Sequence, residues 1–251
     1  MKLNIETRFQ AFAIHLLISS VIFVSFLCLM FFLWYPPPYF ELEGGWIILK
    51  ILIGVDVILG PLLTLVIFKK GKPGLSLDLS LIAAMQLIAL SYGGNIIYQE
   101  RPVFIVFAID RFTVVSAHDI DMDLLIGTDL TRKNHRGPIP VFAKWPDTLE
   151  ERNKLTLGVL HGEADLEFRA EYYEHFIPNL KKALLRSKDA SQYTFTEANK
   201  HAINKFLFDH GIKEIDFALF PVVGKNKDML LAINKQNGKI IDAIDINPWL
   251  N

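Results

Sequence analysis

Three long apolar runs occupy the first hundred residues, and the chain beyond them has no run of comparable length. The runs cover residues 12–35, 46–68 and about 77–97. The first contains no Asp, Glu, Lys or Arg. Since about 20 helical residues, each rising about 1.5 Å, cross the hydrocarbon of a bilayer, each run is long enough to span a membrane. The pattern predicts a domain of three transmembrane helices at residues 1–101.

The residues that flank these runs predict where the helices end. Trp34 and Tyr35 close the first run, where aromatic rings favour the membrane interface, and the prolines at 36–38 stop a helix. The second run ends at Lys69, and a short turn with Gly and Pro at 71–74 precedes the third. Such a short turn predicts that the second and third helices form an antiparallel hairpin.

The Lys and Arg residues around the runs predict the orientation, because these residues are retained on the cytoplasmic side of a membrane. The loop at 36–45 has two glutamates and no Lys or Arg. The basic residues lie before the first run and between the second and third: Lys2, Arg8, Lys69, Lys70 and Lys72. We therefore expect a multi-pass protein of a bacterial inner membrane, with its N-terminus in the cytoplasm and the residues after Arg101 in the periplasm.

Beyond Arg101 the pattern changes to shorter elements. We expect strands at 103–115, 217–223, 229–233 and 240–246, and helices at 147–162, 164–187 and 196–210. Asn237-Gly238 is a strong signal for a hairpin between the last two strands. The predicted fold class is membrane α-helical followed by an α+β periplasmic domain, residues 102–251. We expect its sheet to be antiparallel, with helices on one face.

Two polar residues stand out in the apolar runs. Asp56 lies about ten residues, or roughly 15 Å, inside the second run, so its carboxylate should face protein and not lipid. Gln86 in the third run lies almost equally far from the turn at 71–74. We predict a hydrogen bond from the Gln86 amide to Asp56 that locks the two helices, with Ser25 of the first run nearby. The alternative is that Asp56 receives a polar group from another membrane helix.

The composition of the chain argues against several classes of function. The formal net charge is −1 and no basic run follows the apolar runs, so we expect no nucleic acid partner. The single cysteine, Cys28, lies within the first run, which excludes an internal disulfide and a cysteine zinc site. The histidines lack metal-ligand spacing, and we find no catalytic or phosphate-binding motif. We expect no catalytic residues, no cofactor, no metal and no enzymatic activity.

Several short motifs follow one another between residues 12 and 115. They are Trp34-Tyr35-Pro36, residues 54–64, Gly71-Lys72-Pro73-Gly74-Leu75, Asp78-Leu79, Tyr92-Gly93, Arg101-Pro102 and residues 107–112. Each motif is short, and the specificity lies in their order and spacing. Together they resemble the TfpX/TfpZ family of type IV pilin accessory proteins, and the similarity is looser after Val115.

The resemblance implies an inner-membrane chaperone or assembly factor that helps a cognate major type IV pilin reach or enter the pilus. The partners it implies are this pilin, the lipid bilayer and other pilus assembly proteins. It also raises interest in Arg101, Asp110 and Arg111, just past the predicted membrane exit, where charges otherwise form ordinary pairs. Since the N-terminal helix of such a pilin is itself transmembrane before assembly, we expect the protein to engage both halves of its client.

Two other classes of function remain open: a membrane-anchored enzyme with an unrecognised periplasmic site, and a transmembrane sensor. An enzyme would show a pocket in which titratable groups with shifted pKa values converge. A client-binding protein would show an exposed apolar groove or an unpaired strand edge. A sensor normally needs a cytoplasmic output domain, and the predicted cytoplasmic segments are short.

Overall fold

The computed structural model describes residues 5–126, 128–131 and 137–250, and it divides into two compact units. The first comprises Met1–Trp34 and Gly45–Gln99, and the second comprises Tyr35–Gly44 and Glu100–Asn251. The sequence predicts a single boundary at Arg101, whereas the structure also assigns the segment between the first two long helices to the second unit. Lys2, which contributed to the predicted orientation, lies outside the described residues.

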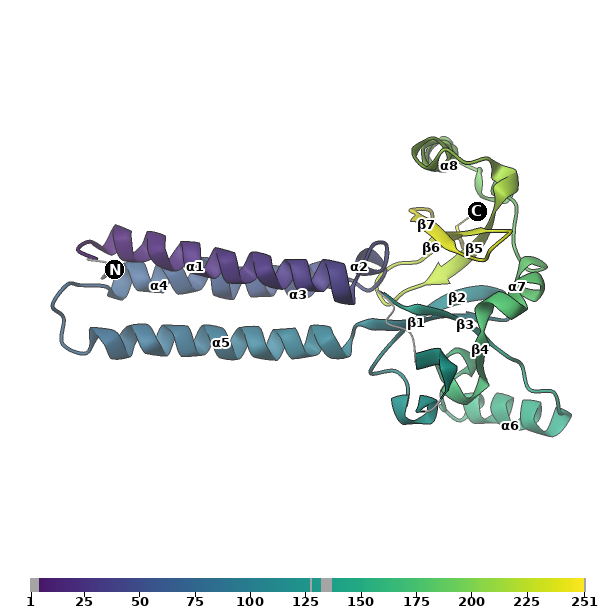
Figure 1. Cartoon of the computed structure of the whole chain (residues 1–251), viewed down its shortest axis with the longest axis horizontal. Coiled ribbons are helices and arrows are strands. Elements are labelled where there is room, and N and C mark those ends of the chain that lie inside the picture. The colour runs from purple at the N-terminus through teal and green to yellow at the C-terminus, as the bar shows by residue number, and fades with distance from the viewer. Residues whose placement is uncertain (1–4, 127, 132–136, 251) are drawn as a thin grey trace. The chain divides into compact units, whose positions relative to one another are not determined.

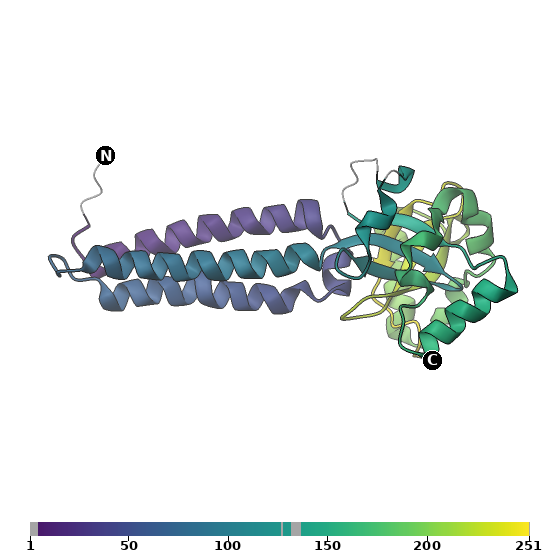
Figure 2. The same ribbon diagram turned by 90° about the horizontal axis from the view of Figure 1, so that it is seen from below.

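The first unit is a bundle of three long helices (Figures 1 and 2). Its first helix is α1 (Arg8–Leu29), continued by the π-helical turn η1 (Met30–Trp34). The second is built from α3 (Gly45–Leu52), the π-helical η2 (Ile53–Leu59) and α4 (Gly60–Ile67), and the third is α5 (Leu75–Gln99). At 27, 23 and 25 residues, all three are long and apolar enough to cross a membrane, as the sequence predicted.

Capping and small residues set the ends and the spacing of these helices. The Thr7 hydroxyl accepts a hydrogen bond from the main-chain N–H of Gln10 at 3.1 Å, and the Gln10 side chain accepts one from the N–H of Thr7. This capping box fixes the start of α1. At Gly93 of α5, a Cβ atom would lie 2.8 Å from a methyl group of Leu52. The small residue therefore allows α5 to approach α3 closely.

The second unit is built on a seven-stranded sheet with the order β4-β3-β1-β2-β5-β6-β7 (Figure 1). The strands are β1 (Pro102–Ala108), β2 (Arg111–Ser116), β3 (Ile139–Ala143), β4 (Tyr173–His175), β5 (Phe217–Val223), β6 (Met229–Asn234) and β7 (Ile240–Ile244). The expected strand at 103–115 is in fact the β1–β2 hairpin, in which Ala108 pairs with Arg111. Its Ile109-Asp110 turn lacks the Gly or Asn that usually marks a two-residue loop.

The expectation of an antiparallel sheet was wrong, because the sheet is mixed. β1 pairs in parallel with β3, and β2 pairs in parallel with β5. The other neighbouring strands pair antiparallel. Parallel neighbours need a long crossover, and the stretches between β2 and β3 and between β4 and β5 provide it. Local strand patterns carry no information about which strands these crossovers bring together.

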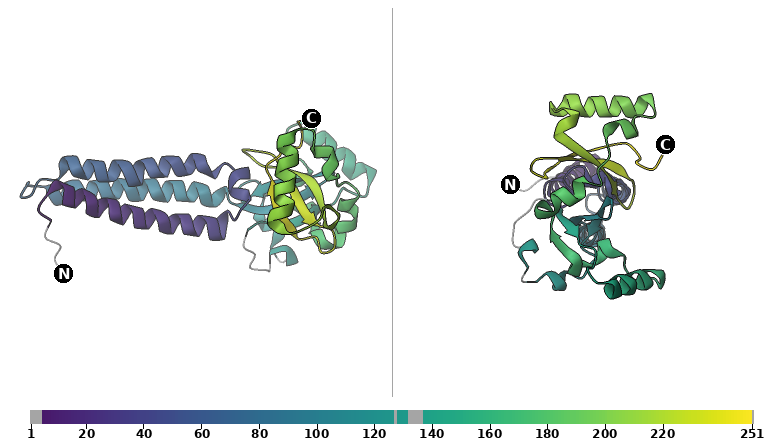
Figure 3. Two further views of the ribbon diagram at one scale, coloured as in Figure 1. Left: turned by 90° about the horizontal axis from the view of Figure 1, so that it is seen from above. Right: turned by 90° about the vertical axis from the view of Figure 1, so that its right-hand side faces the viewer.

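Helices cover both faces of the sheet, so the expectation of one covered face was also wrong. The helices are α6 (Leu149–Leu160), α7 (Phe176–Leu184) and α8 (Glu197–His210). On β1, Ile105 packs in a cluster with Phe176 of α7, while its neighbour Val106 packs in a different cluster with Leu155 of α6. Successive strand residues point to opposite faces, so α6 and α7 lie on opposite sides. Phe206 of α8 packs over β5 and β6, and Figures 1 and 3 show α6 and α8 near opposite ends of the sheet.

The helix expected over 164–187 is interrupted. Tyr173 pairs with Ala143 of β3, and its hydroxyl donates to the Glu167 carbonyl at 2.5 Å, so this part of the chain forms strand β4. Of this stretch only α7 is α-helical, with Pro178 in its first turn, where proline is tolerated. The remaining elements are short 3-10 turns: η3 (Met122–Leu125), η4 (Asp129–Thr131), η5 (Leu166–Phe168), η6 (Ala170–Tyr172), η7 (Ala190–Tyr193) and η8 (Glu214–Asp216).

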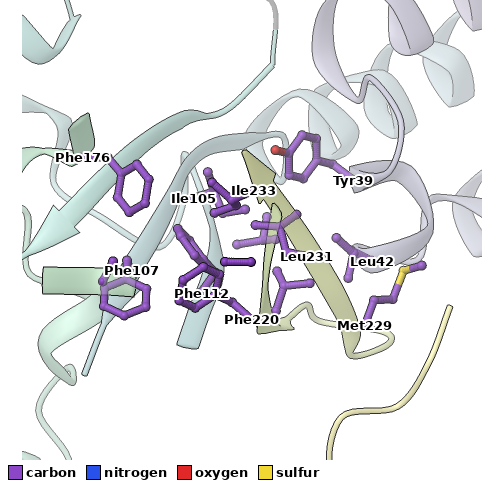
Figure 4. Packing of buried hydrophobic residues seen from close by; sticks show 14 of the residues in the cluster. Tyr39, Leu42, Ile105, Phe107, Phe112, Phe176, Phe220, Met229, Leu231 and Ile233 are labelled. Carbon is purple, nitrogen blue, oxygen red and sulfur yellow. The ribbon is translucent and has the colours of Figure 1, made fainter. Parts of the chain in front are cut away.

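The segment between the first two long helices contributes to the core of the second unit. It contains the short helix α2 (Tyr39–Leu42). The side chains of Tyr39 and Leu42 lie in a hydrophobic cluster with Leu231 and Met229 (Figure 4). Leu42 is fully buried there. We name residues 35–44 the docked segment.

Candidate functional site

The main chain around Asp56 leaves one carbonyl without its usual partner. The N–H of Gly60 bonds to the carbonyl of Val55, five residues earlier, as in a π-helix. The next donor in this register would be residue 61, bonding to the carbonyl of Asp56, but Pro61 has no N–H. Gln86 of α5 supplies the missing donor, because its Nε2 lies 2.9 Å from the main-chain oxygen of Asp56.

The Gln86 side chain also joins the three helices to one another. Its Oε1 lies 2.8 Å from Nε2 of His15 in α1, and Nδ1 of the same ring lies 2.6 Å from the Thr64 hydroxyl of α4. Because the amide nitrogen of Gln86 donates to Asp56, its oxygen must accept, so Nε2 of His15 carries a proton. In the neutral ring, Nδ1 then accepts from Thr64. Ser19 Oγ lies 3.5 Å from Nε2 of Gln86 and completes what we name the polar cluster.

A glycine makes room for this arrangement. A Cβ atom at Gly60 would overlap Nε2 and Cδ of the Gln86 amide, so any side chain there would displace it. At Gly54, in the same helical segment, a Cβ atom would meet nothing within 4 Å. Gly60 is therefore required by the polar cluster, whereas Gly54 is not.

The Asp56 carboxylate does not take part in these bonds. Its residue is only 7% exposed, and neither carboxylate oxygen has a hydrogen-bond partner among the described residues. The structure thus brings Asp56 and Gln86 together, as the sequence suggested, but through the main-chain oxygen of Asp56. Ser25 does not join them, since its hydroxyl donates to the carbonyl of Val21 in its own helix.

Asp56 lines a groove between α1 and α5, which we name the bundle groove. Its volume is about 200 Å³. The lining residues are His15, Ile18, Ser19, Ile22 and Phe23 of α1, Asp56 of η2, and Ala83, Gln86, Leu87 and Leu90 of α5. The walls are apolar and open outward, with Ile18 and Leu87 each more than half exposed. Sites for drug-sized ligands occupy about 300–1,000 Å³, so this groove has the size of one or two side chains.

The residues predicted at the membrane exit do not form one site. Arg101 precedes β1, whereas Asp110 and Arg111 lie in the hairpin at its far end, about 20 Å along a seven-residue strand. Asp110 and Arg111 do pair, with 2.9 Å between Nε and Oδ1. The Arg111 guanidinium also lies 5.0 Å from the centroid of the Trp249 ring. These contacts are those of an ordinary charge pair and a cation–π stack.

A polar clamp holds the docked segment to the β5–β6 turn. The main-chain N–H of Asn226 donates to the carbonyl of Leu42 at 2.9 Å, and its side-chain amide donates to the carbonyl of Glu41 at 3.2 Å. Lys227 pairs with Glu41 at 3.6 Å. At Gly224, a Cβ atom would come within 2.9 Å of the Leu42 side chain, so the turn and the segment are in close contact.

Glu43, the next residue but one after Glu41, has a partly buried carboxyl group with a raised pKa. Nζ of Lys225 pairs with Glu100 at 2.6 Å and with Asp119 at 3.0 Å, leaving Glu43 only the Lys225 main-chain N–H, at 3.4 Å from Oε1. Oε2 of Glu43 is buried without a partner among the described residues. Burial raises the pKa of Glu43 from its ordinary 4.5 to about 7, against the opposing effect of Lys225. Glu43 therefore tends to keep its proton in the folded state.

This chain is similar to known fimbrial assembly proteins. A family described as fimbrial assembly protein FimB matches residues 3–44. The fimbrial assembly protein of Dichelobacter nodosus serogroups C1 and C2 is 39% identical over 114 residues, which cover 45% of this chain and 87% of that protein. The chain belongs to the fimbrial assembly protein FimB family. No solved structure matches it.

Longer members of the FimB family are also similar. The fimbrial assembly proteins of Dichelobacter nodosus serogroups I and E1 are each 40% identical over 114 residues. The matched region covers 45% of this chain and spans less than half, 44%, of each of those two proteins. The family match at residues 3–44 includes His15 and Ser19 of the polar cluster and the whole docked segment.

The second unit of this FimB-family protein carries a groove of its own, which we name the aromatic groove. It has a volume of about 700 Å³. It is lined by Phe107, Ile109, Phe142, Ala143, Trp145, Leu166, Lys182, Leu185 and Arg186. Leu185 and Ile109 are exposed at 85% and 59%, and among the described residues that line the groove only Lys182 and Arg186 are charged. In the part of the chain that the structure describes, no group of His, Cys, Asp or Glu could hold a metal ion.

Sequence reasoning missed three members of the polar cluster: His15, Ser19 and Thr64. A single His, Ser or Thr in an apolar run carries no information about its partner. One signal was available for His15, since it stands near the start of the first run, and Thr64 stands near the end of the second, which returns to the same side. Equal depth makes polar side chains candidates for a hydrogen bond, as it did for Asp56 and Gln86.

Proposed function

We propose that this protein is a bacterial inner-membrane accessory protein that acts as a chaperone or assembly factor for a cognate type IV pilin. The observation that carries this proposal is the 40% identity with fimbrial assembly proteins over 114 residues. The motifs that resemble the TfpX/TfpZ family of type IV pilin accessory proteins support the same role. In this proposal the protein carries out no reaction, and its partners are the major pilin, other pilus assembly proteins and lipid.

The docked segment supports two membrane crossings, by the second and third helices. It follows the first long helix, and the rest of the second unit follows the third. Two parts of one compact unit must lie on the same side of a membrane, which requires an even number of crossings between them. The second and third helices supply those two crossings. With the basic residues of the 68–74 loop in the cytoplasm, the second unit is then periplasmic.

The two grooves support binding of a client that has a membrane helix and a soluble part. The bundle groove lies in the unit that we assign to the membrane, and the aromatic groove lies in the unit that we assign to the periplasm. Exposed apolar grooves are typical of proteins that bind other chains. A pilin before assembly has both a transmembrane helix and a periplasmic domain, so it fits both surfaces.

The proposal is tested in cells that make the cognate pilin. We expect deletion of this gene to reduce surface pili while pilin is still synthesised. We also expect crosslinking and affinity capture of the tagged full-length protein to recover pilin, unlike an identically tagged, unrelated inner-membrane protein. Normal pili in the deletion strain, together with no captured pilin, would refute the proposed function.

A further inference from the structure

The bundle groove is lined by Asp56, whose carboxylate makes no hydrogen bond to the described residues. Asp56 lies eleven residues from either end of the 23-residue helix Gly45–Ile67, hence about 16 Å from each end. At this depth a membrane offers no water to solvate a carboxylate. His15, Thr64 and Gln86 satisfy one another and the Asp56 carbonyl, but the carboxylate oxygens have no partner among the described residues.

We propose that the bundle groove receives the transmembrane helix of the client, with a hydrogen-bond donor on that helix bound to the Asp56 carboxylate. The inference rests on the proposed function and deepens it by naming the contact. The donor is a hydroxyl, an amide or an ammonium group, each of which can donate to a carboxylate oxygen. The client helix presents this group about halfway through the hydrocarbon.

The shape of the groove fits a helix better than other occupants. Its walls come from two helices that both pack on the middle segment, leaving an apolar trough with exposed Ile18, Ile22 and Leu87 along its sides. The 200 Å³ volume accommodates a side chain and is below the range of about 300–1,000 Å³ for small-molecule sites. A lipid acyl chain has no donor for Asp56, and lipid head groups lie at the membrane surface. A client side chain that carries a hydrogen-bond donor fits the volume of the groove and can bond to the carboxylate.

Two neighbouring positions on α5 allow a controlled test. Leu87 lines the bundle groove and is 59% exposed, whereas Met85 does not line it and is 60% exposed. Two residues apart on a helix, they face in nearly opposite directions. A photo-crosslinking amino acid is placed at each position in the full-length protein, in cells that make the cognate pilin. We expect the pilin to be captured from Leu87 and not from Met85.

The role of the carboxylate is tested in the same assay. Asp56→Leu keeps a similar volume and removes the acceptor, and we expect capture from Leu87 to fall about three- to tenfold, the range expected for one hydrogen bond between membrane helices. Asp56→Asn keeps an acceptor oxygen and should retain most of the capture. Unchanged amounts of full-length protein, together with unchanged capture from a crosslinker at Leu185 in the aromatic groove, show that the variants fold.

The outcomes separate this inference from the proposed function. Equal capture of pilin from Leu87 and Met85, or capture of lipid alone from Leu87, would overturn the bundle groove as the binding site. Unchanged capture in Asp56→Leu would overturn the contact with the carboxylate. In those cases, recovery of pilin with the tagged full-length protein from the same cells would still support the proposed function. Failure to capture pilin by any route, with normal pili in the deletion strain, would remove both.

Discussion

At the scale of single residues, the polar cluster depends on two residues that contribute no polar side chain. Pro61 removes the donor that would have satisfied the Asp56 carbonyl, and Gly60 gives Gln86 the space to replace it. A main-chain group left unsatisfied in an apolar environment costs about 1–3 kcal/mol. The sequence therefore couples a break in one helix to a polar residue of another, because the Asp56 carbonyl bonds to a side chain thirty positions away.

The first prediction compares two glycines of the same helical segment. Gly60→Ala should destabilise the helical unit by about 1–3 kcal/mol, because the added methyl displaces Gln86 and forces the packing apart. Gly54→Ala should be neutral or stabilising by up to about 1 kcal/mol, since its methyl meets nothing and alanine favours a helix. Thermal unfolding of the full-length protein in detergent measures both. Equal effects of the two substitutions would contradict the assigned role of Gly60.

The second prediction concerns the pH dependence of the second unit. Folding raises the pKa of Glu43 from 4.5 to about 7, so between these values the folded state binds more protons than the unfolded state. Stability from this group is therefore highest below about pH 4.5, falls as pH rises to 7 and stays low above it. Glu43→Gln should remove this loss, so its melting temperature should exceed that of the unmodified protein at pH 8 and approach it at pH 5.

The control for this experiment is the neighbouring carboxylate of Glu41, whose side chain is 57% exposed. Glu41→Gln removes a negative charge at nearly the same place but leaves the Glu43 carboxyl in its buried position. The pH dependence should persist in Glu41→Gln. Its disappearance there, or its persistence in Glu43→Gln, would show that another group is responsible.

At the scale of elements, the docked segment differs most from what the sequence indicates. A ten-residue connection between two long helices, with three prolines, looks like a simple loop in the sequence. In the structure it forms α2 and inserts Tyr39 and Leu42 into the cluster formed by α7 and the sheet. The connection is therefore a structural element of the second unit, held by the β5–β6 turn.

The third prediction tests the contribution of this element. Leu42→Ala should destabilise the second unit by about 2–5 kcal/mol, because it removes buried methyl groups from a fully packed position. Glu41→Ala, one residue away and on the exposed side, should cost less than about 1 kcal/mol despite losing its pair with Lys227. Chemical denaturation of the full-length protein, monitored by a signal from the second unit, measures the difference. Similar costs for the two changes would contradict the buried role of Leu42.

The elements differ in how far the sequence could predict them. The three long helices follow from apolar length alone, and the Asn237-Gly238 turn between β6 and β7 follows from local turn chemistry. The Ile109-Asp110 turn could not be recognised, since it requires a positive φ of 60° at an isoleucine, which such residues rarely adopt. The mixed strand order and the packing of Leu42 depend on contacts between distant residues. Periodicity does not report such contacts.

The candidate site shows the same limit. Asp56 and Gln86 could be paired because charge and amide groups in apolar runs are conspicuous, and counting from the turn gives their depth. The choice between the main-chain oxygen and the carboxylate of Asp56 depends on the π-helical register at Gly60, which the sequence does not reveal. His15 was overlooked because one uncharged ring does not interrupt an apolar run.

At the scale of the whole molecule, we expect three membrane crossings, with the 68–74 loop in the cytoplasm and the second unit in the periplasm. The fourth prediction uses reporter fusions. A reporter that is active only in the periplasm should be active when fused after residue 250 and inactive when fused after Lys72, and a cytoplasmic reporter should give the opposite result. Activity of the periplasmic reporter at Lys72 would reverse the proposed orientation. The same result at both sites would be incompatible with three crossings.

The docked segment also limits how the second unit can be isolated. A secreted fragment beginning at Glu100 would lack residues 35–44, and the space that Tyr39 and Leu42 fill would expose the apolar side chains of β6 to water. We expect such a fragment to aggregate during purification. Fusing residues 35–44 to its end through a flexible linker should restore solubility. Residues 35–44 precede β5, β6 and β7 in the chain, so the ribosome makes this segment before the strands that pack on it.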